Sequence, residues 1–524
     1  MSGALSEALA TACRQFKAAD ALHVDGVVLR YADLAEHAGA VGARLRQAGL
    51  RPHEPVQVLV SNQAMDIAAL LGVWQAGGVA VPVHRSTPAA VVQGFQQRSR
   101  ARWQLDLHPG SSAAQALSAL AADAPPERAL LRGAALVVFT SGSTGAPKGV
   151  VIAHDAFHGK IGRIDRLLGF GAADRTLGVL NITFSFGLWL SLLTLLRGGT
   201  LVLQPKFEPT PFLLALAEQR ISRVGMVPTM MRLLFADTGH DAAMAALARQ
   251  GDLRQILIGG ESLGLSLAGT IRQRFAGTEL VDIYGLTETA TCDFFAFPAD
   301  FARYPGCIGR PSPDVQHRIV DAQGRPVEPG AVGELQIRSP TLMNGYLDEP
   351  ELTANAYQDG WLRTGDLARG VGGGLGGGLS GGLGGGLGGA LGDGTGDGVG
   401  KVAAGEVVEL MGRLKEVISR GGNKVTPVEI EQAVCAHPDV AAAMATGIAD
   451  ALLGERIHVL VVPRAGAAVD LAALRQHLAT RLERFKQPDA FHIAAALPLG
   501  RTGKADRGQF KALVVAGTLV PEPR

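Results

Sequence analysis

Residues 140–149 read TSGSTGAPKG and combine hydroxyl side chains, three glycines and one lysine. Glycines let a backbone take positive φ and come close to a ligand. Backbone N–H groups and hydroxyls donate hydrogen bonds to anionic oxygens, and Lys148 adds one mobile positive charge. The stretch therefore has the chemistry of a loop that wraps a phosphate. On composition alone, a polar surface hairpin is an equally open interpretation.

Two better-known loops of similar composition do not fit. A Walker A loop needs Gly-Lys-Ser/Thr, whereas here Pro147 precedes Lys148 and Gly149 follows it. A serine-hydrolase elbow, G-x-S-x-G, needs glycine at the position of Ser141. Apolar runs rich in β-branched residues flank the loop at 135–139 and 150–152 and predict two buried strands.

Length and composition limit the class of protein. With 524 residues, 47% hydrophobic and 19% charged, the chain is typical of an ordinary globular protein of two or more domains. The net charge of +1 gives no electrostatic case for nucleic acid or an anionic membrane. Four cysteines without a C-x-x-C pair argue against zinc and a disulfide scaffold. No run reaches the roughly 18–20 apolar residues of a membrane span, and no secretory h-region is visible, so we expect a cytoplasmic location.

Short apolar strands alternate with amphipathic helices, which is the α/β pattern. The sequence predicts strands at 56–60, 79–83, 200–203, 223–227 and 255–258, and a helix at 65–75. After residue 306 the pattern changes to strands linked by turns, at 317–320 and 333–337, which predicts a small β-rich subdomain. From about residue 416 a compact βα pattern resumes, with a helix opening at 427–431 and a strand at 456–462.

The segment from about residue 370 to 400 is a tetrapeptide repeat with leucine at every fourth position and mostly glycine between. Glycine costs roughly 1 kcal/mol per helical residue relative to alanine, so a helix is not credible there. We expect a flexible loop, tolerated because lengthening a turn to about thirty residues costs only roughly 1.6 kcal/mol in closure entropy.

Four further segments, together with the loop at 140–149, resemble the core motifs of the adenylate-forming superfamily, which contains acyl-CoA synthetases, nonribosomal-peptide adenylation domains and luciferases. They are DIYGLTE at 282–288, TGD at 364–366, GRLK at 412–415 and PLGRTGKAD at 498–506. Each alone is an ordinary turn, helix start or basic loop. All of them in the order of the family, over nearly the whole chain, indicate membership.

The resemblance implies a role for each motif. Tyr284 stacks on adenine, Thr287 contacts the α-phosphate and Glu288 binds Mg²⁺. Asp366 accepts hydrogen bonds from both ribose hydroxyls, and Arg413 lies near the ribose and phosphate. Thr287, Glu288 and Lys504 are the implied catalytic residues. The other residues assigned to ATP are Thr140, Ser141, Gly142, Ser143, Thr144, Gly145, Lys148, Gly260, Glu261 and Ser262.

The family also implies an organisation and a reaction. A large α/β N-terminal domain spans 1–412 and contains the β-rich subdomain; residues 413–415 form a hinge with Lys415 as pivot; a small α+β lid spans 416–524. A carboxylate attacks MgATP to give acyl-AMP and pyrophosphate. The lid then rotates, withdraws Lys504, and a thiol attacks the activated carbonyl.

The acid is less constrained than the nucleotide. The implied acyl pocket lies at 181–189, 259–261 and 284–293, and the residues assigned to it are Phe184, Ser185, Phe186, Gly259 and Gly285. Amino-acid-activating relatives hold the substrate ammonium with an aspartate where this chain has Ser185, which argues against an α-amino acid, although Asp293 is near. Phe184 replaces the histidine of many ligases and favours an aryl or medium apolar acid. Ordinary core packing explains these apolar residues equally well.

The thiol acceptor stays open. No carrier domain is visible, so coenzyme A is the default, and loading of a separate carrier protein's phosphopantetheine is the alternative. A nucleotide-binding protein that no longer turns over is a third possibility, against which the intact Thr287, Glu288 and Lys504 count.

Overall fold

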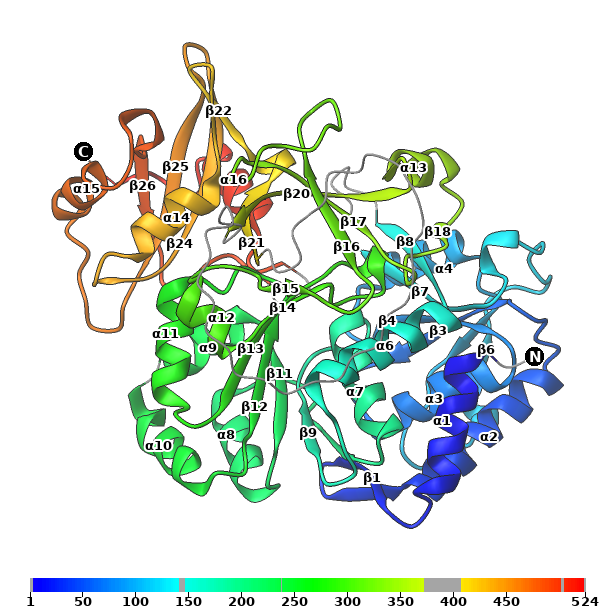
Figure 1. The fold of residues 1–524 in the computed structure, drawn as a ribbon. Helices are drawn as coiled ribbons and strands as arrows, with labels where there is room; N and C mark the ends of the chain where they lie inside the picture. Colours follow the sequence, from blue (N-terminus) through cyan, green and yellow to red (C-terminus); the bar gives the residue numbers. More distant parts are fainter. Residues whose placement is uncertain (1–2, 141–146, 237, 372–406, 501–503, 523–524) are drawn as a thin grey trace, which may run out of the picture.

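The structure is a computed structural model that describes residues 3–140, 147–236, 238–371, 407–500 and 504–522. Within these residues the chain forms a large N-terminal α/β domain on three sheets and a small C-terminal domain on a fourth (Figure 1). The predicted fold class is therefore confirmed. The glycine–leucine segment lies mostly outside the described residues. No described helix has the length and apolar character needed to cross a bilayer.

The first sheet carries the two strands that flank residues 140–149. Its order is β18-β8-β7-β4-β3-β5-β6. The bounds are β3 (Pro55–Val60), β4 (Val79–His84), β5 (Trp103–Leu105), β6 (Leu117–Ala119), β7 (Ala134–Thr140), β8 (Lys148–Ala153) and β18 (Gly345–Tyr346). Thr140 pairs with Lys148 in the antiparallel β7–β8 ladder, so the two strands predicted on either side of the loop are confirmed.

The second sheet has a parallel centre, as the alternating pattern predicts. Its order is β15-β14-β13-β12-β11-β9-β10-β1-β2. The bounds are β1 (Asp20–Val24), β2 (Val27–Arg30), β9 (Arg175–Gly178), β10 (Thr200–Leu203), β11 (Arg223–Met226), β12 (Gln255–Gly259), β13 (Glu279–Tyr284), β14 (Phe294–Ala296) and β15 (Arg310–Pro311). Parallel strands end at one common edge, and ligands of open α/β sheets bind beyond that carboxyl edge.

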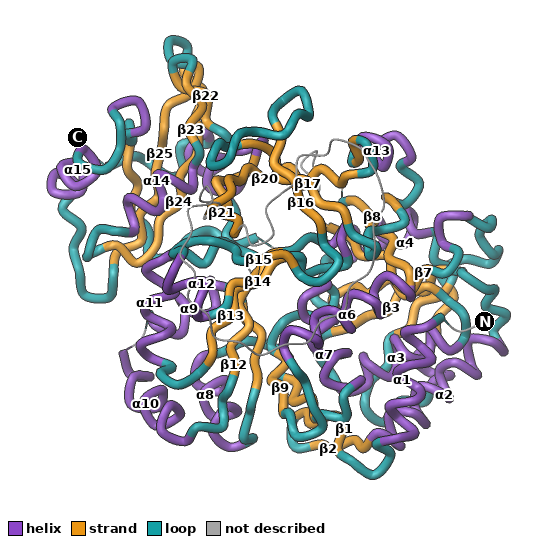
Figure 2. The backbone as a smooth tube through the Cα atoms, in the orientation of Figure 1, coloured by secondary structure: helices purple, strands orange, loops and turns teal. Residues whose placement is uncertain are grey.

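Helices flank both large sheets (Figure 2). They are α1 (Ala4–Gln15), α2 (Tyr31–Gln47), α3 (Ala64–Gln75), α4 (Ala89–Ser99), α5 (Ala113–Ala116), α6 (His154–Leu168), α7 (Ser185–Leu196), α8 (Pro209–Glu218), α9 (Pro228–Phe235), α10 (Asp241–Gln250), α11 (Leu265–Arg274), α12 (Pro298–Arg303) and α13 (Pro350–Asn355). Helices α3 and α7 are apolar on nearly all sides because they lie in the core, where Trp74 and Trp189 are fully buried.

The third sheet is the predicted β-rich subdomain. Its strands are β16 (Gln316–Val320), β17 (Gly333–Arg338), β19 (Tyr357–Gln358), β20 (Trp361–Val371) and β21 (Val407–Arg413). Strands β20 and β21 are antiparallel, and Val371 pairs with Val407. The glycine–leucine segment thus connects two residues that are already neighbours in a ladder.

The C-terminal domain is a five-stranded sheet with three helices, at the top left of Figure 1. Its elements are β22 (Ile418–Arg420), β23 (Asn423–Val425), β24 (Val440–Asp450), β25 (Gly454–Pro463), β26 (Ala490–Ile493), α14 (Pro427–Cys435), α15 (Leu471–Ala479) and α16 (Arg507–Val515). The 3₁₀ turns of the described chain are η1 (Ala129–Leu131), η2 (Thr238–His240), η3 (Thr287–Thr289), η4 (Leu414–Glu416) and η5 (Arg484–Lys486).

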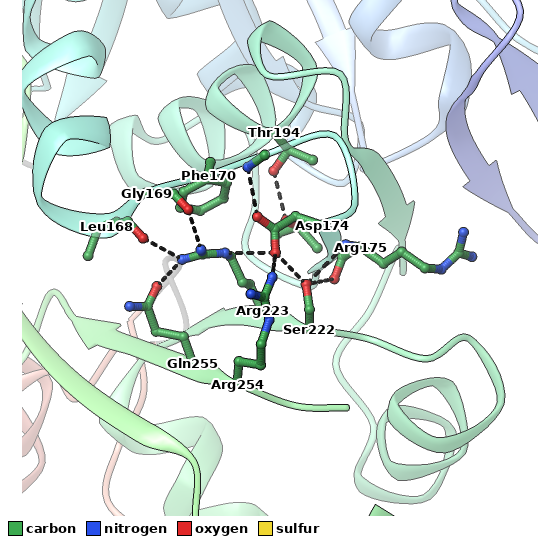
Figure 3. Close-up of polar contacts among 12 residues, drawn as sticks. Leu168, Gly169, Phe170, Asp174, Arg175, Thr194, Ser222, Arg223, Arg254 and Gln255 are labelled. Atoms are coloured by element: carbon green, nitrogen blue, oxygen red, sulfur yellow. Dashed lines mark hydrogen bonds and ion pairs between the residues drawn. The ribbon is translucent and has the colours of Figure 1, made fainter. Parts of the chain in front are cut away.

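A buried polar network ties together the amino ends of β9, β11 and β12 (Figure 3). Arg223 Nε lies 3.0 Å from Asp174 Oδ1, and its Nη2 donates to the Gly169 carbonyl at 2.7 Å. The Ser222 hydroxyl donates to Asp174 at 2.7 Å, and Arg254 pairs with the same carboxylate. Burial alone would raise the pKa of Asp174, but the hydrogen bonds from Ser222 and Arg223 outweigh it and hold the pKa below its usual value. This network braces the edge of the sheet opposite to the cleft described below.

Candidate functional site

A cleft of about 1750 Å³ lies between the N-terminal domain and the C-terminal domain. Its floor is formed where β12 and β13 end, at Gly260 and Tyr284, the carboxyl edge at which the α/β pattern predicts a ligand. One wall comes from β20 and β21 with the turn η4, and the opposite wall comes from the C-terminal domain, including Lys504. Residues from all five predicted motifs therefore border one cavity.

Asp366 lies at the centre of the predicted nucleoside site. Its carboxylate is only 4% exposed; Oδ2 accepts a hydrogen bond from the Tyr284 hydroxyl at 2.6 Å, and Oδ1 lies 3.2 Å from Arg413 Nε. Burial raises the pKa of Asp366, against the opposing effect of Arg413 and Tyr284. A carboxylate offers about four lone-pair sites, so two hydrogen bonds leave capacity for ribose hydroxyls. The structure brings these three residues together, and their roles toward a nucleotide stay predictions.

Glu288 and Lys148 meet around one tyrosine in the predicted phosphate region. The Tyr346 hydroxyl donates to Glu288 Oε1 at 2.9 Å, and Lys148 Nζ lies 5.2 Å from the centre of the Tyr346 ring, in cation–π range. Thr140 and Thr287 also border the cleft. The remaining loop residues assigned to ATP lie outside the described residues: Ser141, Gly142, Ser143, Thr144 and Gly145.

Lys504 reaches from the C-terminal domain into the cleft beside Gly260. A Cβ built on Gly260 would lie 2.8 Å from Lys504 Nζ, which shows how closely the lysine approaches this backbone. The φ of Gly260 is +83°, a conformation that favours glycine. Burial lowers the pKa of Lys504, and the nearby Glu261 carboxylate partly offsets this. Glu261 is itself held by Arg232 at 3.3 Å. Ser262 borders the same cleft.

Lys415, to which the resemblance assigns the hinge, also borders the cleft, in η4 directly after β21. Burial lowers the pKa of Lys415, and the adjacent Arg413 guanidinium lowers it further. The next element, β22, belongs to the sheet of the C-terminal domain. The chain thus passes from one domain to the other at the motif assigned to the hinge; the boundaries at 412 and 415 stay predictions.

The residues assigned to the acyl pocket divide into two groups. Phe184 and Gly285 border the cleft, whereas Ser185, Phe186 and Gly259 are not among its lining residues in the described chain. Phe186 stacks on Trp189 in the core, with ring centres 5.5 Å apart. A Cβ at Gly259 would lie 2.4 Å from the Ile283 carbonyl oxygen. Gly259 therefore serves the close packing of β12 against β13.

Asp293 does not face the cleft. Its carboxylate and the Lys160 ammonium are both fully buried and lie 2.7 Å apart. A carboxylate already paired with a buried lysine is not available for a substrate ammonium. Asp293 was the one residue that kept an α-amino acid open as the substrate, and this ion pair therefore strengthens the argument against such a substrate.

Asp282 and Arg232 also border the cleft, although the sequence motifs assign no role to either. Asp282 precedes Tyr284 by two positions on β13, so both side chains point to the same face of the strand. Burial raises the pKa of Asp282 to about 7, with a backbone N–H of Ile283 opposing. The signal for Asp282 was present, because it belongs to the DIYGLTE motif. Arg232 on α9 belongs to none of the five motifs that we recognised.

Comparisons with known proteins agree with this geometry. The profile of the AMP-binding enzyme family matches residues 9–347, and that of the AMP-binding enzyme C-terminal domain matches residues 429–504. A feruloyl-CoA synthase of Amycolatopsis sp is 29% identical over 507 residues, covering 94% of this chain and 95% of the relative. A sulfoacetate–CoA ligase of Cupriavidus necator is 30% identical over 511 residues, covering 92% of each.

A solved structure shares the fold. The o-succinylbenzoate coenzyme A synthetase of Bacillus subtilis, in complex with ATP and magnesium ion, superposes with a TM-score of 0.75. It is 22% identical, and the match covers 96% of this chain and 99% of that chain.

Proposed function

Because the chain belongs to the AMP-binding enzyme family, we propose that it joins a carboxylic acid to coenzyme A through an acyl-adenylate. It is an AMP-forming acid–thiol ligase in this proposal. One observation carries it: Lys504 of the C-terminal domain enters the cleft that Tyr284, Glu288 and Asp366 border from the N-terminal domain. These residues have the chemistry to bind a base, a ribose and a reacting phosphate in one place.

In the first half-reaction a carboxylate oxygen attacks the α-phosphorus of ATP and pyrophosphate leaves. The carboxylate is already ionised at pH 7, so no general base is needed. What the protein must supply is positive charge, since two anions approach each other and more charge develops in the transition state. In this proposal Lys148 supplies it from the N-terminal domain, Lys504 from the C-terminal domain, and Arg413 from a position beside Asp366.

Magnesium suits the acidic residue present. Mg²⁺ prefers oxygen ligands and is commonly held by one or two carboxylates together with the substrate's phosphates. Glu288 borders the cleft and is oriented by the Tyr346 hydroxyl. The described residues contain no cluster of three or more acidic, His or Cys side chains that could hold a metal ion by themselves. When bound, the ion neutralises phosphate charge and orients the leaving pyrophosphate. Glu288 would be its protein ligand.

In the second half-reaction the thiol of coenzyme A attacks the carbonyl and AMP leaves. We infer that the C-terminal domain first rotates about Lys415 and takes Lys504 out of the cleft. The position of Lys504 beside Gly260 then represents the adenylating arrangement. Arg464 of the C-terminal domain also reaches Ser266 of α11 at 3.3 Å, a contact that this rotation would break.

The acid in this proposal is an aryl or medium apolar acid without an α-ammonium group. Phe184 faces the cleft, and the only carboxylate that the sequence offered as a counter-ion, Asp293, is neutralised by Lys160. The named substrates of the two relatives, ferulate and sulfoacetate, differ in size and charge, so they do not choose among acids.

Acid-dependent exchange of pyrophosphate into ATP tests the proposal. The panel should contain ferulate, benzoate, octanoate, sulfoacetate and an α-amino acid. Mass spectrometry of reactions with coenzyme A, or with a phosphopantetheinylated carrier protein, then identifies the acceptor. We expect exchange with at least one apolar acid and an acyl-CoA product. Exchange without acyl-CoA would favour a carrier protein, and no exchange with any acid would favour a protein that binds nucleotide without turnover.

A further inference from the structure

The segment from Tyr284 to Asp293 is a closed loop that carries the phosphate-region residues Thr287 and Glu288. Its ends are joined by a hydrogen bond from the Asp293 N–H to the Tyr284 carbonyl at 2.7 Å, and Thr291 N–H donates to the Leu286 carbonyl at 2.9 Å. A ligand bound by this loop is positioned only as well as the loop itself.

The returning arm of this loop has an unfavourable backbone conformation. Ala290, Thr291 and Cys292 have φ values of 59°, 89° and 46°, in the left-handed region that residues with a Cβ seldom adopt. The arm also lies against Gly285, where a Cβ would come within 2.2 Å of the Cys292 nitrogen. Surrounding contacts must therefore hold the arm in place.

A buried ion pair supplies such a contact. Lys160 on α6 lies 2.7 Å from Asp293 Oδ1 and donates to the Cys292 carbonyl at 3.4 Å, so it grips two consecutive residues at the end of the strained arm. Both charged side chains are completely buried. Burial raises the pKa of Asp293, and Lys160 and the Thr289 hydroxyl oppose that rise.

The same carboxylate reaches the turn that carries the phosphate-region residues. The Thr289 hydroxyl donates to Asp293 Oδ2 at 2.5 Å, and the Leu286 carbonyl oxygen, at 2.9 Å, is its second acceptor. The oxygen of the same hydroxyl accepts from the Leu286 N–H at 3.4 Å. Thr289 is the last residue of η3, which begins with Thr287 and contains Glu288. Contacts therefore run without a break from α6 through Asp293 and Thr289 to the 3₁₀ turn.

We propose that Lys160, Asp293 and Thr289 are positioning residues that hold Thr287 and Glu288 for MgATP. Apolar side chains would stabilise a buried site as well as an ion pair or better, because desolvation of two charges is costly. A directional pair instead fixes where the loop lies. The inference rests on the proposed function, because it assigns a purpose to the nucleotide loop of that function.

Thr289→Val tests the connection with the smallest change of shape, because it replaces only the hydroxyl by a methyl group. Thr194→Val, on α7, is a matched control, since Thr194 is as buried as Thr289. The Thr194 hydroxyl also contacts a side-chain oxygen, that of Thr176, and a carbonyl oxygen, that of Leu190, each at 2.8 Å. We expect Thr289→Val to lower kcat/KM for MgATP in the exchange reaction on the order of tenfold or more. Thr194→Val should remain within about twofold of wild type, with a similar change in Tm. Equal kinetics for the two variants would overturn the proposal.

Variants of the ion pair separate positioning from stability. Lys160→Arg keeps the charge and should retain kcat within a few-fold, whereas the double variant Lys160→Met/Asp293→Leu should fold with a Tm near that of wild type yet lose activity like Thr289→Val. A folded double variant with wild-type kcat and KM contradicts the proposal even if single variants unfold. MgATP binding measured by calorimetry and pyrophosphate exchange, both with the wild-type protein, are the reference measurements. If the wild-type protein shows neither, the proposed function is contradicted, and not the positioning role of these residues.

Discussion

Asp366 on β20 and Arg413 on β21 are paired residues of one antiparallel ladder, and their side chains form an ion pair of 3.2 Å. Strand pairing thus places the Asp366 carboxylate beside Arg413, the last residue before the turn η4. The same ladder continues to Val371 and Val407, where the glycine–leucine segment leaves and returns. We therefore expect the geometry of the site to depend on this ladder.

Replacing residues 372–406 by Asn-Gly should therefore leave both half-reactions within a few-fold of wild type. The dipeptide suits a two-residue hairpin turn, and the closure entropy of a shorter loop favours the folded state slightly. The rates of pyrophosphate exchange and of thioester formation are the measurements, with an equally long Gly-Ser segment as control. A loss confined to thioester formation would show that the segment assists the second step.

Asp366→Asn should raise the KM for MgATP about ten- to hundredfold, because a hydrogen bond to a charged group contributes on the order of 1.5–3 kcal/mol. Glu409→Gln is the matched control: Glu409 pairs with Arg369 at 2.7 Å across the same two strands, but it is not a lining residue of the cleft. Steady-state exchange kinetics compare the two variants. Equal increases in KM would mean that a disturbance of the two strands, and not the loss of the Asp366 carboxylate, weakens MgATP binding.

The Asp174 network should make stability depend on pH in the acid range. The folded-state pKa of Asp174 is below its unfolded value of about 3.9, so its contribution is complete above about pH 5 and is lost as pH falls through the folded-state pKa. Asp174→Asn should lower the free energy of unfolding by up to about 3–5 kcal/mol at pH 7, because Arg223 stays buried without its counter-charge. Its stability should also rise less steeply between pH 3.5 and 5.

Urea unfolding at several pH values measures this difference. Ser191→Ala serves as control, since it removes one buried hydroxyl hydrogen bond in α7 without removing a charge. If Asp174→Asn and wild type had parallel stability profiles between pH 3.5 and 7, the pKa of Asp174 would not be depressed.

Much of the fold could be predicted from local patterns. The strands expected at 56–60, 79–83 and 200–203 correspond to β3, β4 and β10, and the helix expected at 65–75 is α3. Such elements are predictable because periodicity and β-branched residues report burial directly. The order of strands within each sheet has no comparable local signal.

The residues of the site could be predicted only where they belong to a recognised motif. Lys160 and Asp293 meet across 133 positions of sequence, and neither belongs to a recognised motif. Ser185 and Phe186 were assigned to the pocket, but α7 is apolar on nearly all sides and so its sequence does not tell which side faces the cleft. The approach of Lys504 to Gly260 depends on how two domains are oriented, which no local pattern encodes.

Separate measurement of the two half-reactions catalysed by Lys504→Ala is the most direct test of the proposed mechanism. Lys424→Ala, a change of an exposed lysine elsewhere in the C-terminal domain, is the control. If Lys504 stabilises the charge of the adenylation transition state and is withdrawn before the thiol attacks, acid-dependent pyrophosphate exchange should fall about 10²–10³-fold. Thioester formation from supplied acyl-AMP should stay within a few-fold of wild type. An equal fall in both half-reactions would contradict the account.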